Sequence, residues 1–223
     1  MKKIVRVGYV VCMCTFGAAV ALAAPKDSTF KRWSYFRVGF DAASLAGSLL
    51  NPDFARFEIQ VDSRYKKDLY AVFETGLGRC SWQNTYLTSS ASNQFIRVGV
   101  DKTFFGLERA QDLDNAFVGI RYALSRVARN ASTYLIQDPV WGTAEGSIPA
   151  KTFLAHWLEL TAGFRFEIRP NLFAGWQVRA RTFINPKRFE ELPPAYLAGY
   201  GRGDRNTTFG LQFYISYGIG RRK

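Results

Sequence analysis

Apolar and polar residues alternate along most of the chain after residue 34, which predicts β-strands with one apolar and one polar face. In the longest such run, residues 153–168, Leu158 and Leu160 share one face, whereas Glu159 and Arg165 share the other. Eight segments have this period: 34–43, 55–62, 69–78, 94–102, 116–126, 153–168, 172–183 and 207–219. No segment has the pattern of an amphipathic helix of useful length. The sequence therefore predicts an all-β fold.

The connections between these segments alternate in length. The long ones are 44–54, 79–93, 127–152 and 184–206, and the shorter ones are 63–68, 103–115 and 169–171. Long loops at one end and short turns at the other are typical of outer-membrane barrels. We therefore expect residues 34–219 to form an eight-stranded antiparallel up-and-down transmembrane β-barrel, with both termini at the short-turn, periplasmic end.

The N-terminal segment predicts export. Residues 1–23 read as a signal peptide, with Lys2, Lys3 and Arg6 before an uncharged stretch and an A-x-A cleavage site at Ala21–Ala23. The alternative is an uncleaved anchor helix, because residues 7–24 are just long enough to span a bilayer. Residues 24–33 then form a periplasmic tail and residues 220–223 a basic C-terminal tail. The predicted location is the outer membrane of a bacterial cell.

Composition narrows the class of protein further. The chain has 223 residues, and its aromatic content of 16% argues against a disordered protein. Its formal net charge is +12, which falls to +9 when the three cations of the signal peptide leave. Of the cysteines, only Cys80 remains in the mature chain, so an internal disulfide is excluded. A catalytic pair of Cys80 with His156, the one histidine, is not favoured, because the two are far apart in sequence.

The polar strand face predicts which side of the sheet meets lipid. A soluble barrel also has an apolar face, but that face is turned inward. Here the polar face carries arginine rather than lysine, and the planar guanidinium suits a narrow lumen where charges must pair with carboxylates. Glycines share this face and leave room for those side chains. We therefore predict a structural charge network in the lumen that consists of Arg37, Asp41, Arg56, Glu58, Asp62, Glu74, Arg97, Asp101, Arg121, Glu159, Arg165, Glu167, Arg179 and Arg181.

Three segments, His156–Leu160, Gly163–Glu167 and Asn171–Arg179, carry a resemblance to a known family. The chain resembles an uncharacterised family of Bacteroidetes outer-membrane β-barrel proteins, catalogued as a domain of unknown function. The resemblance implies an outer-membrane barrel without an established activity. The layout is more distantly similar to small barrels of the OmpA and OmpX type. Many such proteins end in an aromatic residue, whereas this chain ends in Arg221-Arg222-Lys223, and Tyr217 is the nearest substitute.

The sequence contains no motif that predicts a cofactor, a metal site or a catalytic centre. Metal-ligand spacings and phosphate-binding glycine loops are both absent from it. The expected partners are outer-membrane lipid, lipopolysaccharide and the barrel assembly machinery; nucleic acid is not expected because the protein is exported, and an extracellular partner stays unknown. Candidate lipopolysaccharide contacts at the long-loop end are Arg126, Arg129, Lys151, Lys187, Arg188, Arg202 and Arg205.

These observations favour a structural or surface-interaction role through loops 79–93, 127–152 and 184–206. Three alternatives stay open at this point. The barrel could be a narrow pore, or a lipid-modifying outer-membrane enzyme that uses His156. The third alternative is a soluble, lipocalin-like periplasmic carrier, whose apolar face would line a cavity.

Overall fold

A computed structural model describes residues 35–66, 68–104, 114–185 and 192–220. The predicted signal peptide, the predicted periplasmic tail and residues 221–223 lie outside these ranges. Within them, the strands are β1 (Tyr35–Asp41), β2 (Arg56–Lys66), β3 (Leu69–Gln83), β4 (Leu87–Thr103), β5 (Asn115–Arg129), β6 (Ser132–Asp138), β7 (Gly142–Ile148), β8 (Lys151–Arg169), β9 (Leu172–Phe183) and β10 (Thr207–Gly220). Two helical segments, α1 (Ala42–Leu50) and the 3-10 turn η2 (Pro52–Phe54), join β1 to β2.

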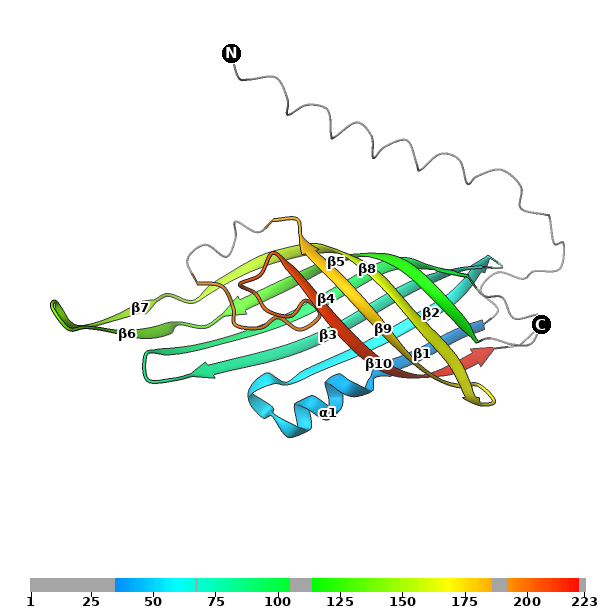
Figure 1. The fold of residues 1–223 in the computed structure, drawn as a ribbon, viewed down its shortest axis with the longest axis horizontal. Helices are drawn as coiled ribbons and strands as arrows, with labels where there is room; N and C mark the ends of the chain where they lie inside the picture. Colours follow the sequence, from blue (N-terminus) through cyan, green and yellow to red (C-terminus); the bar gives the residue numbers. More distant parts are fainter. Residues whose placement is uncertain (1–34, 67, 105–113, 186–191, 221–223) are drawn as a thin grey trace, which may run out of the picture. The chain divides into compact units, whose positions relative to one another are not determined.

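Eight of the described strands close into a ring, which confirms the predicted fold class (Figure 1). The ring runs β1-β2-β3-β4-β5-β8-β9-β10 and closes where β10 pairs with β1. Every pairing is antiparallel, and successive ring strands are neighbours. At the short-turn end, β8 turns directly into β9 at Asn171, whose φ of 67° is the left-handed conformation that asparagine tolerates.

The two faces of the sheet have opposite polarity. On β4, Arg97 is 0% exposed, whereas its neighbours Ile96 and Val98 are 47% and 50% exposed. The same alternation recurs on β5, where Arg121 points inward between the outward Ile120 and Tyr122. The charged face therefore lines the lumen and the apolar face covers the outside. The interpretation as a carrier with an apolar cavity is wrong for this reason.

The ring is longer on one side than the alternation indicated, and the prediction of a long loop at 79–93 is wrong. Strands β3 and β4 stay paired up to Gln83 and Thr88, so that only residues 84–86 connect them. Asn84 closes this turn, because its side-chain oxygen accepts from the backbone N–H groups of Tyr86 and Leu87. The extension was missed because residues 88–93 are nearly all polar, so they have no apolar face that would mark a strand.

The predicted loop 127–152 contains a β-hairpin. Strands β6 and β7 pair from Ser132–Ile148 to Asp138–Gly142, and β6 also pairs briefly with β4. The hairpin projects from the long-loop end of the barrel (Figure 1). Most of its residues are exposed, so neither face carries the apolar alternation on which the prediction of strands depended.

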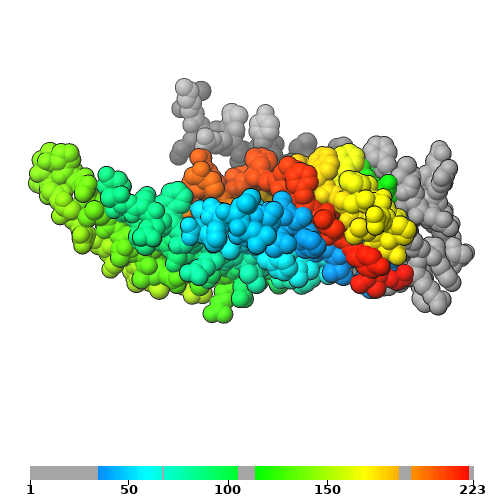
Figure 2. All heavy atoms as spheres, turned by 90° about the horizontal axis from the view of Figure 1, so that it is seen from below, coloured from blue at the N-terminus to red at the C-terminus, as the bar shows by residue number. Residues whose placement is uncertain are grey.

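The predicted loop 44–54 contains the helix α1, which the sequence analysis did not predict. Asp41 caps its first turn, accepting from the backbone N–H groups of Ala43 and Ser44 at 3.0 and 3.1 Å. The helix has no charged residue, so it has no polar and apolar sides for the periodicity to detect. No helix in the described ranges has the length and apolar character to cross a membrane. Figure 2 shows α1, in blue, on the outer surface of the barrel.

Candidate functional site

Glu74 of β3 is the centre of the ion pairs inside the barrel. Its carboxylate lies 2.8 Å from Arg97 Nε, 2.8 Å from Arg121 Nε and 2.9 Å from Arg179 Nη1. These arginines come from β4, β5 and β9, so a single carboxylate ties together strands from both sides of the lumen. All four side chains are nearly or fully buried. Such charges are tolerated only when they are paired, because an isolated buried charge costs several kcal/mol.

A second carboxylate extends these ion pairs toward the long-loop end. Glu159 of β8 lies 2.8 Å from Arg179 and 3.1 Å from Arg97, and it accepts from the Trp157 indole N–H at 2.6 Å. Arg181 approaches Glu159 at 3.7 Å and donates to the carbonyl of Tyr200 at 3.1 Å. Arg97 also pairs with Glu58. The charges thus form a continuous set rather than separate pairs.

Toward the short-turn end, Asp62 and Asp101 continue the set. Asp62 pairs with Arg37 at 2.5 Å, and Arg165 lies 3.6 Å from Asp62 and 3.8 Å from Asp101. Asp101 also pairs with Arg121 at 3.1 Å. The Arg165 guanidinium lies 5.0 Å from the centre of the Phe117 ring, within cation–π range.

A glycine leaves the room that these long side chains need. A Cβ atom at Gly119 on β5 would lie 2.0 Å from Asp101 Oδ1 and 2.9 Å from Thr161 Oγ1. Any larger residue would therefore displace the carboxylate that pairs with Arg121. Two other glycines make room for arginines directly, because a Cβ at Gly99 would lie 2.6 Å from Arg121 Cγ and one at Gly210 would lie 2.6 Å from Arg181 Nη1.

Three of the predicted network residues lie elsewhere. Asp41 caps α1 and also accepts from the Ser44 hydroxyl, because β1 ends at this residue. Arg56 lies at the long-loop end of β2, where it donates to the hydroxyl of Tyr196. Glu167 lies at the short turn, where it accepts from the Asn171 backbone N–H at 2.6 Å. The strand period assigned their faces, but it could not show that each sits where its strand leaves the lumen.

Residues 192–206 fold back over the mouth of the barrel, a feature that the sequence analysis did not predict. Leu197 and Tyr200 are 0% exposed, and the Tyr200 ring stacks on Phe183 at 3.7 Å between ring centroids. Asn93 holds this segment through two hydrogen bonds of 3.0 Å, one to the carbonyl and one from the N–H of Ala198. Burial raises the pKa of the Tyr200 hydroxyl to about 12. The apolar residues within this glycine-rich segment were the available signal.

The candidate lipopolysaccharide contacts differ in their exposure. Arg126, Lys151, Arg202 and Arg205 are exposed, whereas Lys187 and Arg188 lie outside the described residues. The prediction that Arg129 is a surface contact is wrong, because Arg129 is only 3% exposed. Its guanidinium donates to the backbone carbonyls of Leu192 and Pro149 at 2.9 and 3.2 Å. Its strand parity directs it inward, where it ties two loops together. Asp204 bonds to Arg202, which lowers the pKa of the Asp204 carboxyl.

His156 of β8 lies in an aromatic contact near the outer face. Its Nδ1 is 3.1 Å from the Tyr122 hydroxyl, and the two rings meet edge to face at 6.0 Å between centroids. Its backbone N–H donates to the side chain of Asn185 at 3.1 Å. Among the described residues, no group of His, Cys, Asp and Glu side chains has the arrangement of a metal site.

Fold and interior together define a closed eight-stranded antiparallel barrel with a charged core and an apolar exterior. The chain belongs to the family described as "Domain of unknown function (DUF6048)", whose model matches residues 1–223. The predicted membership of a family of unknown function is thereby confirmed, and the Bacteroidetes origin stays a prediction. A search of curated proteins finds no match.

Two solved structures have a similar fold. The chain is similar to Ail, the attachment invasion locus protein of Yersinia pestis, at 7% identity and a TM-score of 0.42, over 83% of this chain and 97% of Ail. It is also similar to Neisserial surface protein A, at 9% identity and a TM-score of 0.47, over 86% of this chain and 100% of that protein.

Proposed function

We propose that this protein is an integral β-barrel of the bacterial outer membrane, with a lumen filled by paired charges. One observation carries this proposal: Arg97 is fully buried between Ile96 and Val98, which are about half exposed. In water, an exposed apolar band and a charged core would both be unfavourable. In a bilayer, the apolar band meets lipid, and the backbone of a closed barrel satisfies its own hydrogen bonds. Insertion would require the barrel assembly machinery.

The contents of the lumen favour a closed barrel over a narrow pore. An eight-stranded barrel has an interior just wide enough for side chains. Here Glu74 and Glu159 bridge arginines across that interior, and Leu197 and Tyr200 close its mouth. The role we propose is therefore structural, or one of surface interaction, and not conduction or catalysis.

The long-loop end offers the surface for an interaction. The β6–β7 hairpin carries Val140 and Trp141 at its tip, where they are 81% and 89% exposed. Asp138 fixes this tip by accepting from the backbone N–H groups of both residues at 2.7 and 2.9 Å, which lowers the pKa of its carboxyl. An exposed tryptophan on an ordered tip is suited to contact an extracellular partner.

Fractionation tests the proposal. Cells that express the full chain would be separated into soluble, inner-membrane and outer-membrane fractions on a sucrose gradient, and the membranes would then be washed in alkaline carbonate. We expect the protein in the outer-membrane fraction after washing. Recovery in the soluble periplasm without detergent would overturn the proposal.

A further inference from the structure

The barrel wall has a gap on one side of β10. Strand β1 ends at Asp41, which is opposite Tyr214, whereas β10 begins seven residues earlier at Thr207. On the other side, β2 pairs with β1 only from Ile59 onward, although β2 begins at Arg56. The upper part of β10 therefore has no strand neighbour on this side within the described chain. Helix α1 occupies the outer surface beside the gap, in contact with both β10 and β2 (Figure 2).

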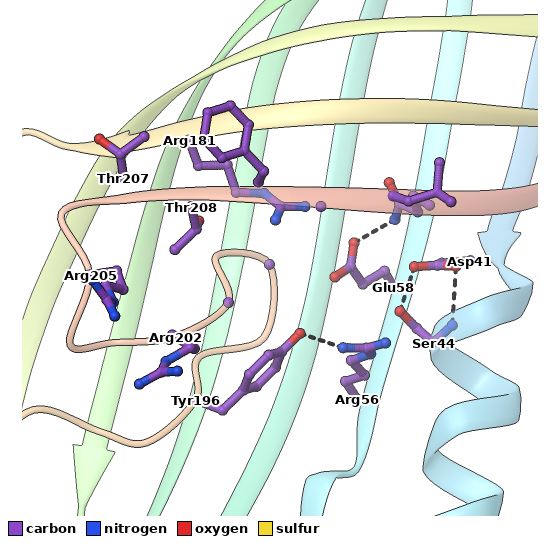
Figure 3. Close-up of a pocket in the computed structure, with 16 residues that line it drawn as sticks. Asp41, Ser44, Arg56, Glu58, Arg181, Tyr196, Arg202, Arg205, Thr207 and Thr208 are labelled. Carbon is purple, nitrogen blue, oxygen red and sulfur yellow. Dashed lines mark hydrogen bonds between the residues drawn. The ribbon is translucent and has the colours of Figure 1, made fainter.

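A cavity of about 520 Å³ lies at this gap (Figure 3). Its lining includes Thr208 and Gln212 from the inner face of β10, and Phe209 and Leu211 from the outer face. Phe209 is 81% exposed and Leu211 is 57% exposed. One cavity can reach both faces of a strand only around an open edge. The cavity therefore connects the upper lumen to the side of the barrel.

The cavity is basic. Four arginines line it, namely Arg56, Arg181, Arg202 and Arg205, and Figure 3 shows them together with Tyr196 around the same space. Tyr196 positions Arg56, because the Tyr196 hydroxyl accepts a hydrogen bond from the Arg56 guanidinium. The guanidinium also lies 5.5 Å from the centre of the Tyr196 ring.

Two of these arginines have carboxylate partners, because Arg202 pairs with Asp204 at 2.7 Å and Arg181 lies 3.7 Å from Glu159. The two carboxylates that line the cavity, Asp41 and Glu58, are engaged with other groups. Asp41 accepts from the N-terminal backbone of α1 and from Ser44. Glu58 pairs with Arg97 and accepts from Gln212 at 2.9 Å. No carboxylate in the described ranges pairs with Arg56. A cavity lined by four guanidinium groups and two carboxylates is complementary to a phosphate.

We propose that this lateral cavity binds the phosphate of a lipid headgroup, and that the lipid enters sideways through the gap between β10 and β2. The inference rests on the proposed outer-membrane location, because the cavity must face the lipid layer. Arg56 and Arg205 contact the phosphate, whereas Ser44 and Thr208 keep their hydroxyl hydrogens on Asp41 and on the carbonyl of Tyr200. Acyl chains lie against Phe209 and Leu211 outside the wall. The apolar outer surface of α1, with Leu49 78% exposed, continues this contact.

Binding to the purified full chain in an uncharged detergent tests the inference. The probes are dihexanoyl phosphatidic acid, which carries a phosphate and two acyl chains, and inorganic phosphate alone, with calorimetry as the readout. We expect saturable binding of the phosphatidic acid, weakened about tenfold or more in Arg56→Gln and in Arg205→Gln, since each removes a charged hydrogen-bond donor. The matched control is Arg169→Gln, which removes an exposed arginine at the short-turn end of β8, outside the cavity, and leaves binding unchanged.

The possible outcomes separate this inference from the proposed function. Equal affinity of the wild type, Arg56→Gln and Arg205→Gln for the phosphatidic acid overturns the inference. Inorganic phosphate that binds as tightly as the phosphatidic acid also overturns it, because the site then takes a soluble anion. Retained binding in Arg56→Lys, which keeps the positive charge, supports the inference. This variant gives a result even if Arg56→Gln fails to fold. If the protein is soluble without detergent, the proposed outer-membrane function is overturned, and the inference that rests on it is overturned with it.

Discussion

Glu74 and Arg179 lie on strands that are not neighbours in the ring, yet two hydrogen bonds of 2.9 Å join them across the lumen. The pair is bidentate, with each carboxylate oxygen accepting from one guanidinium nitrogen. Because Glu74 also contacts Arg97 and Arg121, its single negative charge faces three positive ones. The stability of the barrel should therefore depend strongly on this one side chain.

Glu74→Gln should destabilise the folded barrel by about 3–5 kcal/mol, because it leaves buried arginines without their main partner. Urea unfolding of the detergent-solubilised protein, followed by tryptophan fluorescence, measures this change. Glu145→Gln makes the same chemical change at an exposed position on β7 and should have little effect. Equal unfolding midpoints for the two variants would contradict the claim that the stability of the barrel depends on Glu74.

Gly119→Ala should destabilise the barrel, because the added Cβ would lie 2.0 Å from the carboxylate oxygen of Asp101. Gly47→Ala is the matched control in α1, where the nearest atom to a new Cβ is 3.9 Å away. Gly47→Ala should leave the free energy of unfolding unchanged or raise it by up to about 1 kcal/mol, since alanine favours the helical conformation. The temperature at which each variant loses its compact form on a gel checks both. Equal temperatures would show that the lumen at Gly119 has spare volume.

Asn93→Ala should release residues 192–206 from the barrel mouth, because both hydrogen bonds to Ala198 are lost. Trypsin should then cleave faster after Arg202 and Arg205, and mass spectrometry of the fragments gives the rate. Asn130→Ala is the control, because it removes only an exposed bond to Ser90. A rate that is the same in both variants would mean that the stacking of Tyr200 on Phe183 holds the segment by itself.

The wild-type protein should not conduct when it is inserted in a planar bilayer. Its lumen is filled by Arg97, Arg121, Arg165 and Arg179 with their carboxylates, and Tyr200 closes the mouth. Current traces should lack steady openings, and recovery of the compact form from the same membranes shows that insertion has occurred. Steady openings on the nanosiemens scale would support the pore alternative instead.

The strands of the ring could be predicted from the sequence because each has a buried polar face and an exposed apolar face. The strand predicted at 172–183 has the bounds of β9, and the inward position of Arg97, Arg121 and Arg179 follows from the alternation alone. Which charges meet could not be predicted. Glu74 contacts arginines from three other strands, and those contacts depend on barrel curvature and stagger, which a period of two does not encode.

The remaining features were missed because they lack this alternation of polar and apolar faces. Helix α1 contains no charge, and the β6–β7 hairpin is exposed on both faces, so neither has the polarity pattern of a ring strand. The hairpin turn did carry a local signal in Asp138-Pro139 and in Gly142, which has a φ of 82°. The gap beside β10 depends on where β1 ends. The Asp41 cap determines that point, and the alternation extended the strand two residues too far.

Heat modifiability tests the central claim most directly. The outer-membrane fraction would be run on an SDS gel unboiled and after boiling, and the protein would be detected in both lanes. A closed barrel resists cold SDS, so we expect a compact, faster-migrating form that shifts to the position of the unfolded chain on boiling. A single band at the same position in both lanes, from protein that was folded before the detergent was added, would contradict the closed membrane barrel.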